Sequence, residues 1–273
     1  MNGYYVKKVQ GIIDVSPPDP DVSIDYTDQY MKMKADHPEF EFQCVPPSKI
    51  SLIIKNMKQT GAQGHDQIST HVLKKFEQVL TPYITKIVNL AIMTSTYPQT
   101  WKYGIISPVP KSGDLIVDKN WRPVTLLPVM SKILEKVLNE QLKEYTENHR
   151  ILSPSQHAYR AGKSTETAWA DLDARIQKAT DNCKYIGLLL VDMSAAFNLV
   201  DKQIIVPKLK RMGVGELAVK LIFSYLTCRK SRVKVKGLYS AWIAVKTGIG
   251  EGSVLGPLIF INSLLIHSCA QRG

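Results

Sequence analysis

The residues best suited to chemistry stand at the end of one apolar run. Residues 185–191 read Tyr-Ile-Gly-Leu-Leu-Leu-Val, Asp192 follows directly, and Phe197 comes five residues later. Such a run is typical of a buried strand, and a strand end is a rigid place for a carboxylate that binds a metal ion. The spacing therefore predicts that Asp192 is a metal ligand. Taken as a lone acid, Asp192 is also suited to cap a helix that starts after it.

A second carboxylate for such a site is not evident downstream. Residues 202–273 contain no Asp, and their only acids are Glu216 and Glu251. Catalysis with two metal ions needs carboxylates that converge on both ions. If Asp192 supplies half of such a site, we expect the other half to lie outside these 273 residues.

Positive charge is concentrated towards the C-terminus. The net charge is +11, and residues 202–273 hold 12 Lys and Arg against two acids. Residues 1–45, in contrast, hold eight acids against four Lys. This asymmetry favours a polyanionic partner, nucleic acid first, for the C-terminal half. A basic surface that is merely solvated is the alternative.

The Cys and His residues indicate neither a zinc site nor a disulfide framework. The sequence has no Cys-x-x-Cys, and its six His residues show no ligand spacing. Unpaired thiols of this kind suggest an intracellular protein, nuclear or cytoplasmic, and not a secreted one. The longest uncharged apolar run, residues 254–266, is too short to cross a membrane, so we expect a buried element there and no membrane partner.

The periodicity of the apolar residues predicts an α+β fold. Helical spacing is found at residues 48–57, 68–94, 131–145, 164–179, 201–209 and 216–225, with Ser48 and Asp201 as possible caps. Strands are expected at residues 105–110, 121–126, 185–192, 232–236 and 242–246. Residues 111–114 form a plausible hairpin tip between the first two strands, and the glycine-dense residues 248–253 are expected to be irregular.

Five motifs follow one another in a fixed order. They run from Pro110 to Gly113, Asn120 to Pro128, Leu152 to Thr165, Val191 to Phe197, and Gly252 to Pro257. Together they resemble the reverse-transcriptase domain of non-LTR (LINE-type) retrotransposons, in the style of jockey and CR1-like elements. The resemblance covers residues 46–260, and several motifs in one order make it highly specific.

The resemblance implies the fingers and part of the palm of a right-hand polymerase, without its thumb or its central palm hairpin. The implied parts are an acidic linker or tail at 1–45, a helical extension of the fingers at 46–104, fingers at 105–184, a partial palm at 185–261 and a divergent tail at 262–273. We expect the tail at 1–45 to be packed at most by short segments. The implied partners are an RNA template, a DNA primer and a dNTP.

The resemblance also implies roles for single residues. Asp192 would be catalytic and would bind Mg²⁺ together with the backbone carbonyl of Met193. Phe197 would lie under the sugar and exclude a 2′-hydroxyl group. Lys111 and Arg122 would grip the triphosphate, as two cations on a hairpin can do.

The remaining implied contacts are to the base and the template. Glu251, Gly252 and Ser253 would shape the nucleotide pocket against the template base. Arg160 and Ser164 lie in a motif that is expected to touch the template.

Three departures from the family pattern bear on activity. Gly250 and Glu251 stand where the family usually has Pro and Gln, and Asn198 stands where an Asp is common. The Tyr/Phe-Ala-Asp-Asp tetrad, which supplies the second carboxylate pair, is absent from the 273 residues. We therefore expect a reverse-transcriptase fragment that is inactive alone. The alternatives are a catalytically dead, basic nucleic-acid-binding module and a chain without a stable function.

Overall fold

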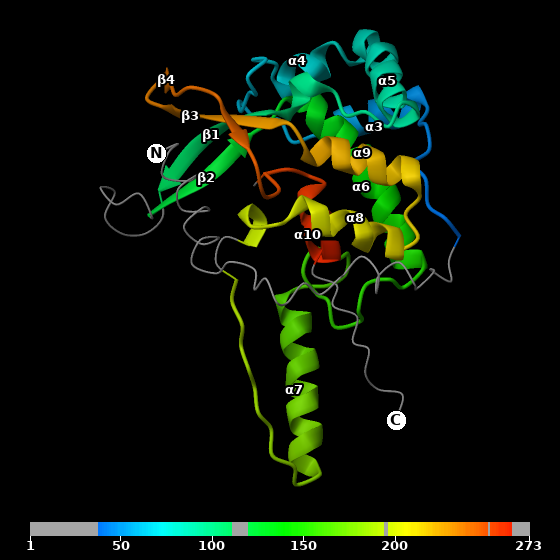
Figure 1. Cartoon of the computed structure of the whole chain (residues 1–273), viewed down its shortest axis with the longest axis vertical. Coiled ribbons are helices and arrows are strands. Elements are labelled where there is room, and N and C mark those ends of the chain that lie inside the picture. Colours follow the sequence, from blue (N-terminus) through cyan, green and yellow to red (C-terminus); the bar gives the residue numbers. More distant parts are fainter. Residues whose placement is uncertain (1–37, 111–119, 194–195, 251, 264–273) are drawn as a thin grey trace.

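Helices and one small mixed sheet make up the fold. The computed structural model describes residues 38–110, 120–193, 196–250 and 252–263 (Figure 1). Helices and strands are intermixed along the chain, so the predicted mixture of α and β elements is confirmed. None of the helices in the described part of the chain is long and apolar enough to span a membrane.

Four helices form the N-terminal half of the core. They are α3 (Pro47–Lys55), α4 (Thr70–Lys75), α5 (Glu77–Met93) and α6 (Val129–Asn148). The cap expected at Ser48 is wrong, because α3 begins at Pro47, whose fixed φ suits the first position of a helix. The apolar face predicted for α6 is buried along its whole length, through Ile133, Leu134, Leu138 and Leu142.

Five strands form the sheet. They are β1 (Tyr103–Pro110), β2 (Trp121–Leu126), β3 (Arg229–Val235), β4 (Leu238–Tyr239) and β5 (Ile243–Val245). The order is β2-β1-β3-β4, with β5 also paired to β3. β1 and β2 form the predicted antiparallel hairpin, whose expected tip at 111–114 lies outside the described residues. β3 runs parallel to β1, so two segments far apart in sequence share one sheet (Figure 1).

The C-terminal helices pack beside this framework. They are α8 (Lys202–Arg211), α9 (Glu216–Leu226) and α10 (Gly256–Ser263). Asp201 caps α8 as predicted, because its Oδ1 accepts a hydrogen bond from the Gln203 amide at 2.8 Å. In the described part of the predicted apolar run, Leu255 and residues 258–261 are buried, as predicted, and Ile259 is fully enclosed. Residues 264–266 of the run lie outside the described residues.

Residues 38–46, the described residues before α3, pack against the body of the molecule. Phe42 is buried, and the Phe40 ring contacts those of Phe42 and Tyr145 at 5.0 and 4.9 Å between centroids. Glu41 accepts hydrogen bonds from the Leu217 and Ala218 amides at 3.0 and 2.6 Å. These amides belong to the first turn of α9, whose own N-cap residue, Gly215, offers no side chain. Glu41 therefore caps a helix that is distant in sequence.

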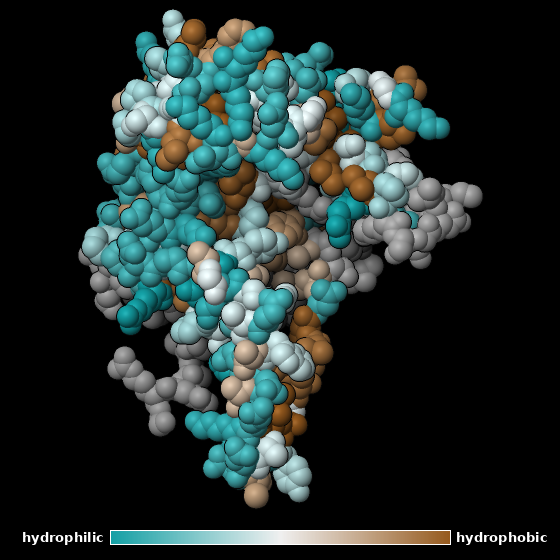
Figure 2. Space-filling view, turned by 180° about the vertical axis from the view of Figure 1, so that it is seen from behind, coloured by the Kyte–Doolittle hydropathy of each residue, from teal (hydrophilic) through white to brown (hydrophobic). Residues whose placement is uncertain are grey.

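An arm projects from the body of the molecule. It consists of α7 (Thr165–Asp181) and an extended return segment, residues 184–193 (Figure 1). No residue of α7 is fully buried. The return segment exposes Leu189, Leu190 and Val191, and a strip of apolar surface follows the arm (Figure 2).

The buried strand predicted at residues 185–192 is wrong. These residues are extended and exposed, and no strand in the described part of the chain pairs with them. The physical reason is that an apolar run specifies only which side chains avoid water. A strand also needs a neighbour that satisfies its backbone N–H and C=O groups.

We expect Glu41→Ala to lower the free energy of unfolding by about 1 to 2 kcal/mol, because two amide donors of α9 lose their acceptor. Urea denaturation of the 273-residue chain measures the effect. Glu144→Ala is the control, since Glu144 is exposed on α6. Equal midpoints for the two variants would show that the remote cap does not stabilise α9.

Candidate nucleotide site

Phe197 lies beside the glycine loop, residues 248–255, which follows β5. The Ile249 amide donates to the Phe197 carbonyl at 2.8 Å, and the Gly248 amide donates to the Val200 carbonyl at 2.9 Å. Gly248 has φ +82°, and a Cβ atom there would lie 2.7 Å from the Asn198 Cα. Only glycine allows this conformation and this close approach. The loop is therefore held against the segment that follows Asp192.

The Phe197 ring is fixed from two sides. It stacks on Phe260 of α10, with centroids 4.5 Å apart and an interplanar angle of 26°. Tyr159 contacts it edge-on at 6.2 Å. The ring is half-buried, so it forms a rigid apolar surface beside the glycine loop.

The β1–β2 hairpin touches the same loop through its backbone. Gly252 has φ +92°, and a Cβ atom there would lie 2.9 Å from the Thr125 carbonyl oxygen of β2. Ser253, the next residue, is buried. The structure therefore brings together three of the predicted positions: Phe197, Gly252 and Ser253.

A buried carboxyl group holds the end of the loop. Glu135 of α6 is 0% exposed. Its Oε2 accepts hydrogen bonds from the Val254 and Leu255 amides at 2.6 and 3.2 Å, just ahead of α10. Ser131 donates to Oε1 at 2.8 Å, and the Tyr225 hydroxyl group donates to Oε2 at 3.4 Å. An acceptor at the start of a helix is also favoured by the helix dipole.

The sequence interpretation missed Glu135. The available signal was its place within the apolar face of α6, next to Leu134 and one turn from Leu138. An acid on a buried helix face needs hydrogen-bond donors to offset the cost of removing it from water. That requirement marks such a residue as one that organises a neighbouring segment.

The phenols around Glu135 are neutral donors. Burial raises the pKa of Tyr225 well above its ordinary value, and the charge of Glu135 raises it further. Burial and the same charge also raise the pKa of Tyr97, whose hydroxyl group contacts the Ser131 Oγ at 2.9 Å. Both phenols therefore keep their protons throughout the physiological range of pH.

Arg229 is a buried cation beside the glycine loop. Arg229 of β3 is buried, donates to the Tyr225 carbonyl at 3.1 Å and lies 3.8 Å from where a Cβ of Gly250 would be. Burial lowers the pKa of Lys102 and of Lys202, and the charge of Arg229 lowers both further. Lys202 donates to the Val245 carbonyl at 3.0 Å, which ties α8 to β5.

Asp192 and Met193 lie on the exposed return segment of the arm. No hydrogen bond or ion pair links Asp192 to another described residue. No group of three or more His, Cys, Asp and Glu residues suited to a metal ion occurs within the described ranges. The carboxylates present there do not fit a two-metal centre.

Two residues expected to touch the template have structural roles. Arg160 donates to both Glu147 carboxylate oxygens, at 3.0 and 2.6 Å, and to the Ser153 carbonyl at 2.8 Å. This pairing holds the pKa of Glu147 below its ordinary value. Ser164 is the N-cap of α7 and accepts from the Thr167 amide at 3.3 Å. A template contact of either residue stays a prediction.

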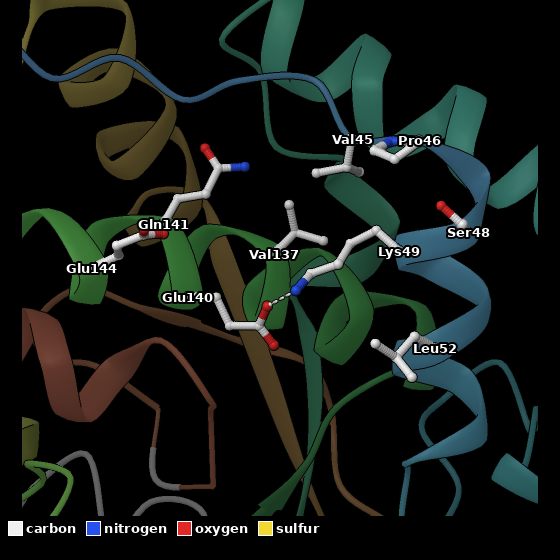
Figure 3. Close-up of a pocket in the computed structure, with 9 residues that line it drawn as sticks. All are labelled: Val45, Pro46, Ser48, Lys49, Leu52, Val137, Glu140, Gln141 and Glu144. Atoms are coloured by element: carbon white, nitrogen blue, oxygen red, sulfur yellow. Dashed lines mark ion pairs between the residues drawn. The ribbon is translucent and has the colours of Figure 1, made fainter.

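The remaining predicted site residues either do not join the cluster around Phe197 or lie outside the described residues. Arg122 is exposed on β2. Lys111 and Glu251 lie outside the described residues. A depression between α3 and α6 is bridged by the ion pair of Lys49 and Glu140, whose Nζ and Oε2 lie 2.5 Å apart (Figure 3). None of the residues that line it is a predicted site residue.

Comparison with known families identifies the class of protein. The family described as "Reverse transcriptase (RNA-dependent DNA polymerase)" matches residues 109–269. The match covers more than half of the chain and includes β2, Phe197 and the glycine loop. The chain belongs to the reverse transcriptase family.

Similar proteins narrow the class to non-LTR retrotransposons. The chain is 30% identical over 215 residues to "Probable RNA-directed DNA polymerase from transposon X-element" of Drosophila melanogaster, which is 78% of this chain and 24% of that protein. It is 28% identical over 208 residues, 76% of this chain and 23% of the relative, to the "Probable RNA-directed DNA polymerase from transposon BS" of the same species. The resemblance to the non-LTR type is confirmed. The chain spans only about a quarter of the length of these two relatives.

We expect Glu135→Ala to lower the free energy of unfolding by about 3 kcal/mol, because buried donors lose their acceptor. Glu135→Gln, which keeps one acceptor oxygen, should cost less but should speed hydrogen exchange at the Val254 and Leu255 amides. Urea denaturation and exchange measured by NMR test both effects. Glu144→Ala, an exposed position on the same helix, is the control. If it matches Glu135→Ala, the buried carboxyl group does not hold the loop.

Proposed function

We propose that the chain is part of an RNA-directed DNA polymerase of a non-LTR retrotransposon and contains its fingers and part of its palm. The observation that carries the proposal is the meeting of Phe197, the glycine loop and the backbone of β2. An aromatic ring beside a loop with open backbone is suited to the sugar and base of an incoming nucleotide. The relatives' names, which specify RNA-directed DNA polymerases, support the same assignment.

In this proposal each element positions one part of the substrate. The Phe197 ring packs under the sugar and leaves no room for a 2′-hydroxyl group. Gly252 and Ser253 shape the base pocket, and Glu135 fixes the end of their loop. Lys111 and Arg122 form the triphosphate side, Glu251 lies with Gly252 and Ser253 at the pocket, and Arg160 and Ser164 organise the motif next to the template.

Reverse transcriptases generally use divalent metal ions and bind an RNA template, a primer and a dNTP. For this chain, Asp192 and the Met193 carbonyl are the proposed metal ligands. One carboxylate does not fix two ions, and Mg²⁺ binds weakly unless several oxygen ligands converge. We therefore propose that the 273 residues, which lack the Ala-Asp-Asp tetrad, do not catalyse synthesis by themselves.

We also propose how the fold corresponds to the parts of a right-hand polymerase. The proposed right hand comprises fingers, with a helical extension, and a palm that lacks its thumb and its central hairpin. Residues 184–193 are rich in apolar side chains that are exposed. A palm strand without its partner strands would have these properties, which supports an incomplete palm. Reading the genomic sequence beyond the codon for Ile261 tests this, since an Ala-Asp-Asp in any frame would supply the second carboxylate pair.

We expect no primer extension by the purified 273-residue chain on RNA or DNA templates with Mg²⁺ or Mn²⁺, because the second carboxylate pair is absent. A gel-based extension assay with labelled primer measures this. Asp192→Ala is the control for contaminating polymerase. Template-dependent extension that disappears in Asp192→Ala would contradict the prediction.

A second candidate function is a basic nucleic-acid-binding module without catalysis. It is favoured by the 12 Lys and Arg among residues 202–273. In either case we expect electrostatic, sequence-tolerant binding of single strands. With about 4 to 6 phosphates contacted, log K should fall against log salt with a slope of about −3 to −4 in filter binding. A flat salt dependence, or a strong preference for one sequence, would contradict it.

A further inference from the structure

Cations and aromatic rings alternate along one face of the sheet. Because side chains alternate along a strand, Lys230, Arg232 and Lys234 of β3 share a face. Pairing places Tyr103 of β1 beside Lys230 and Tyr239 of β4 beside Lys234. Trp242, which precedes β5, completes the set. We call these six residues the cation–aromatic ladder.

The members of the ladder form one continuous row of contacts, each with the next. The Arg232 guanidinium lies between two rings, 4.0 Å from the Tyr239 centroid and 4.5 Å from that of Trp242. Trp242 contacts Tyr103 at 5.3 Å between centroids. The ends are lysines, with Lys230 Nζ 5.8 Å from Tyr103 and Lys234 Nζ 5.3 Å from Tyr239. Each contact is a cation–π or aromatic interaction of ordinary length.

His65 supports two rings of the ladder from inside the fold, and two of the rings keep part of their surface exposed to solvent. His65 lies 5.4 Å from Tyr103 and 6.1 Å from Trp242, between centroids. Its loop is held close to α6, because a Cβ atom on Gly64 would lie 2.7 Å from the Pro128 Cα. Tyr239 is 44% exposed and Trp242 36% exposed, so both retain surface for another planar group.

Among the described residues, no ion pair neutralises the positive charge of the ladder. None of the ion pairs found in the described part of the chain includes Lys230, Arg232 or Lys234. The Arg232 Nε is buried without a hydrogen-bond partner there. The register of β1 with β2 and β3 places Arg122 on this same face. The basic face therefore extends from the ladder to the fingers hairpin.

We propose that the cation–aromatic ladder binds single-stranded nucleic acid, with bases stacked on Tyr239 and Trp242 and phosphates paired with the lysines. Rings in a positively charged surface are suited to this partner, because every unpaired base offers a π face and every nucleotide an anion. A duplex hides its base faces, and an acidic peptide needs only the cations. The inference rests on the proposed function insofar as that function requires a nucleic acid.

The experiment separates stacking from charge. The whole 273-residue chain is titrated into labelled single-stranded RNA of about 10 nucleotides, and into an abasic chain with the same number of phosphates, with anisotropy as the readout. The double variant Tyr239→Leu/Trp242→Leu should weaken RNA binding about tenfold or more and leave abasic binding unchanged. Lys234→Gln should weaken both. Single-stranded DNA replaces RNA in a third titration to show whether the sugar matters.

Matched controls come from α5 and the residue before it. Phe76→Leu/Tyr83→Leu removes two exposed rings, and Lys86→Gln removes one exposed charge. Neither should change binding. Thermal melting of every variant excludes loss of folding, and only variants that melt cooperatively are compared.

Each outcome has one meaning. Loss of RNA binding alone in the ladder double variant supports the proposal. Equal weakening for RNA and the abasic chain would show a purely electrostatic surface and overturn it. If the ladder double variant binds RNA as tightly as the Phe76→Leu/Tyr83→Leu control, RNA binds elsewhere on the protein. That result would overturn only this inference. No binding by the unmodified chain would count against the proposed function as well.

Discussion

The hydrogen bonds of the buried Glu135 carboxyl group connect the parts of this molecule on which the candidate site depends. They join α6, whose apolar face forms the centre of the core, to the two amides just ahead of α10. The glycine loop ends at those amides, and α10 carries the ring on which Phe197 stacks. The end of the loop is thereby fixed, because the amides that have no partner within α10 find an acceptor on a rigid helix. The geometry around Phe197 follows from that connection.

Much of the framework could be predicted from local sequence. Helices with a regular apolar face, such as α6 and α9, were recognisable from periodicity, and the cap at Asp201 from its residue type. The β1–β2 hairpin was recognisable from alternation on either side of a turn cluster. The association of Phe197 with Gly252 and Ser253 came from family resemblance, since no local pattern joins residues that are over fifty positions apart.

The errors have a common physical origin in partners that are remote in sequence. Residues 185–192 have the composition of a strand, but a strand forms only with a neighbour, and none is present in the described residues. The pairing of Arg160 with Glu147 was also not evident from residue type, and a template contact of Arg160 stays a prediction. From its residue type, Glu135 resembles any acid on a helix. Its role follows only from the amides ahead of α10, which donate to it in the fold. Residue type predicts what a group needs, whereas the fold decides which group satisfies it.

The contact between Glu41 and α9 also has a consequence for the order of events during biosynthesis. The cap and the helix it serves are 177 positions apart in the pair that includes Ala218, and Phe40 forms an isolated bridge with Val214. Contacts of such large sequence separation form late, because the intervening chain must first be ordered. While the ribosome is still making residues 46–215, Glu41 has no helix to cap, although Gln43 can already bond to Gln141 of α6. The contact between Glu41 and α9 is therefore among the last to form, only after α9 has emerged.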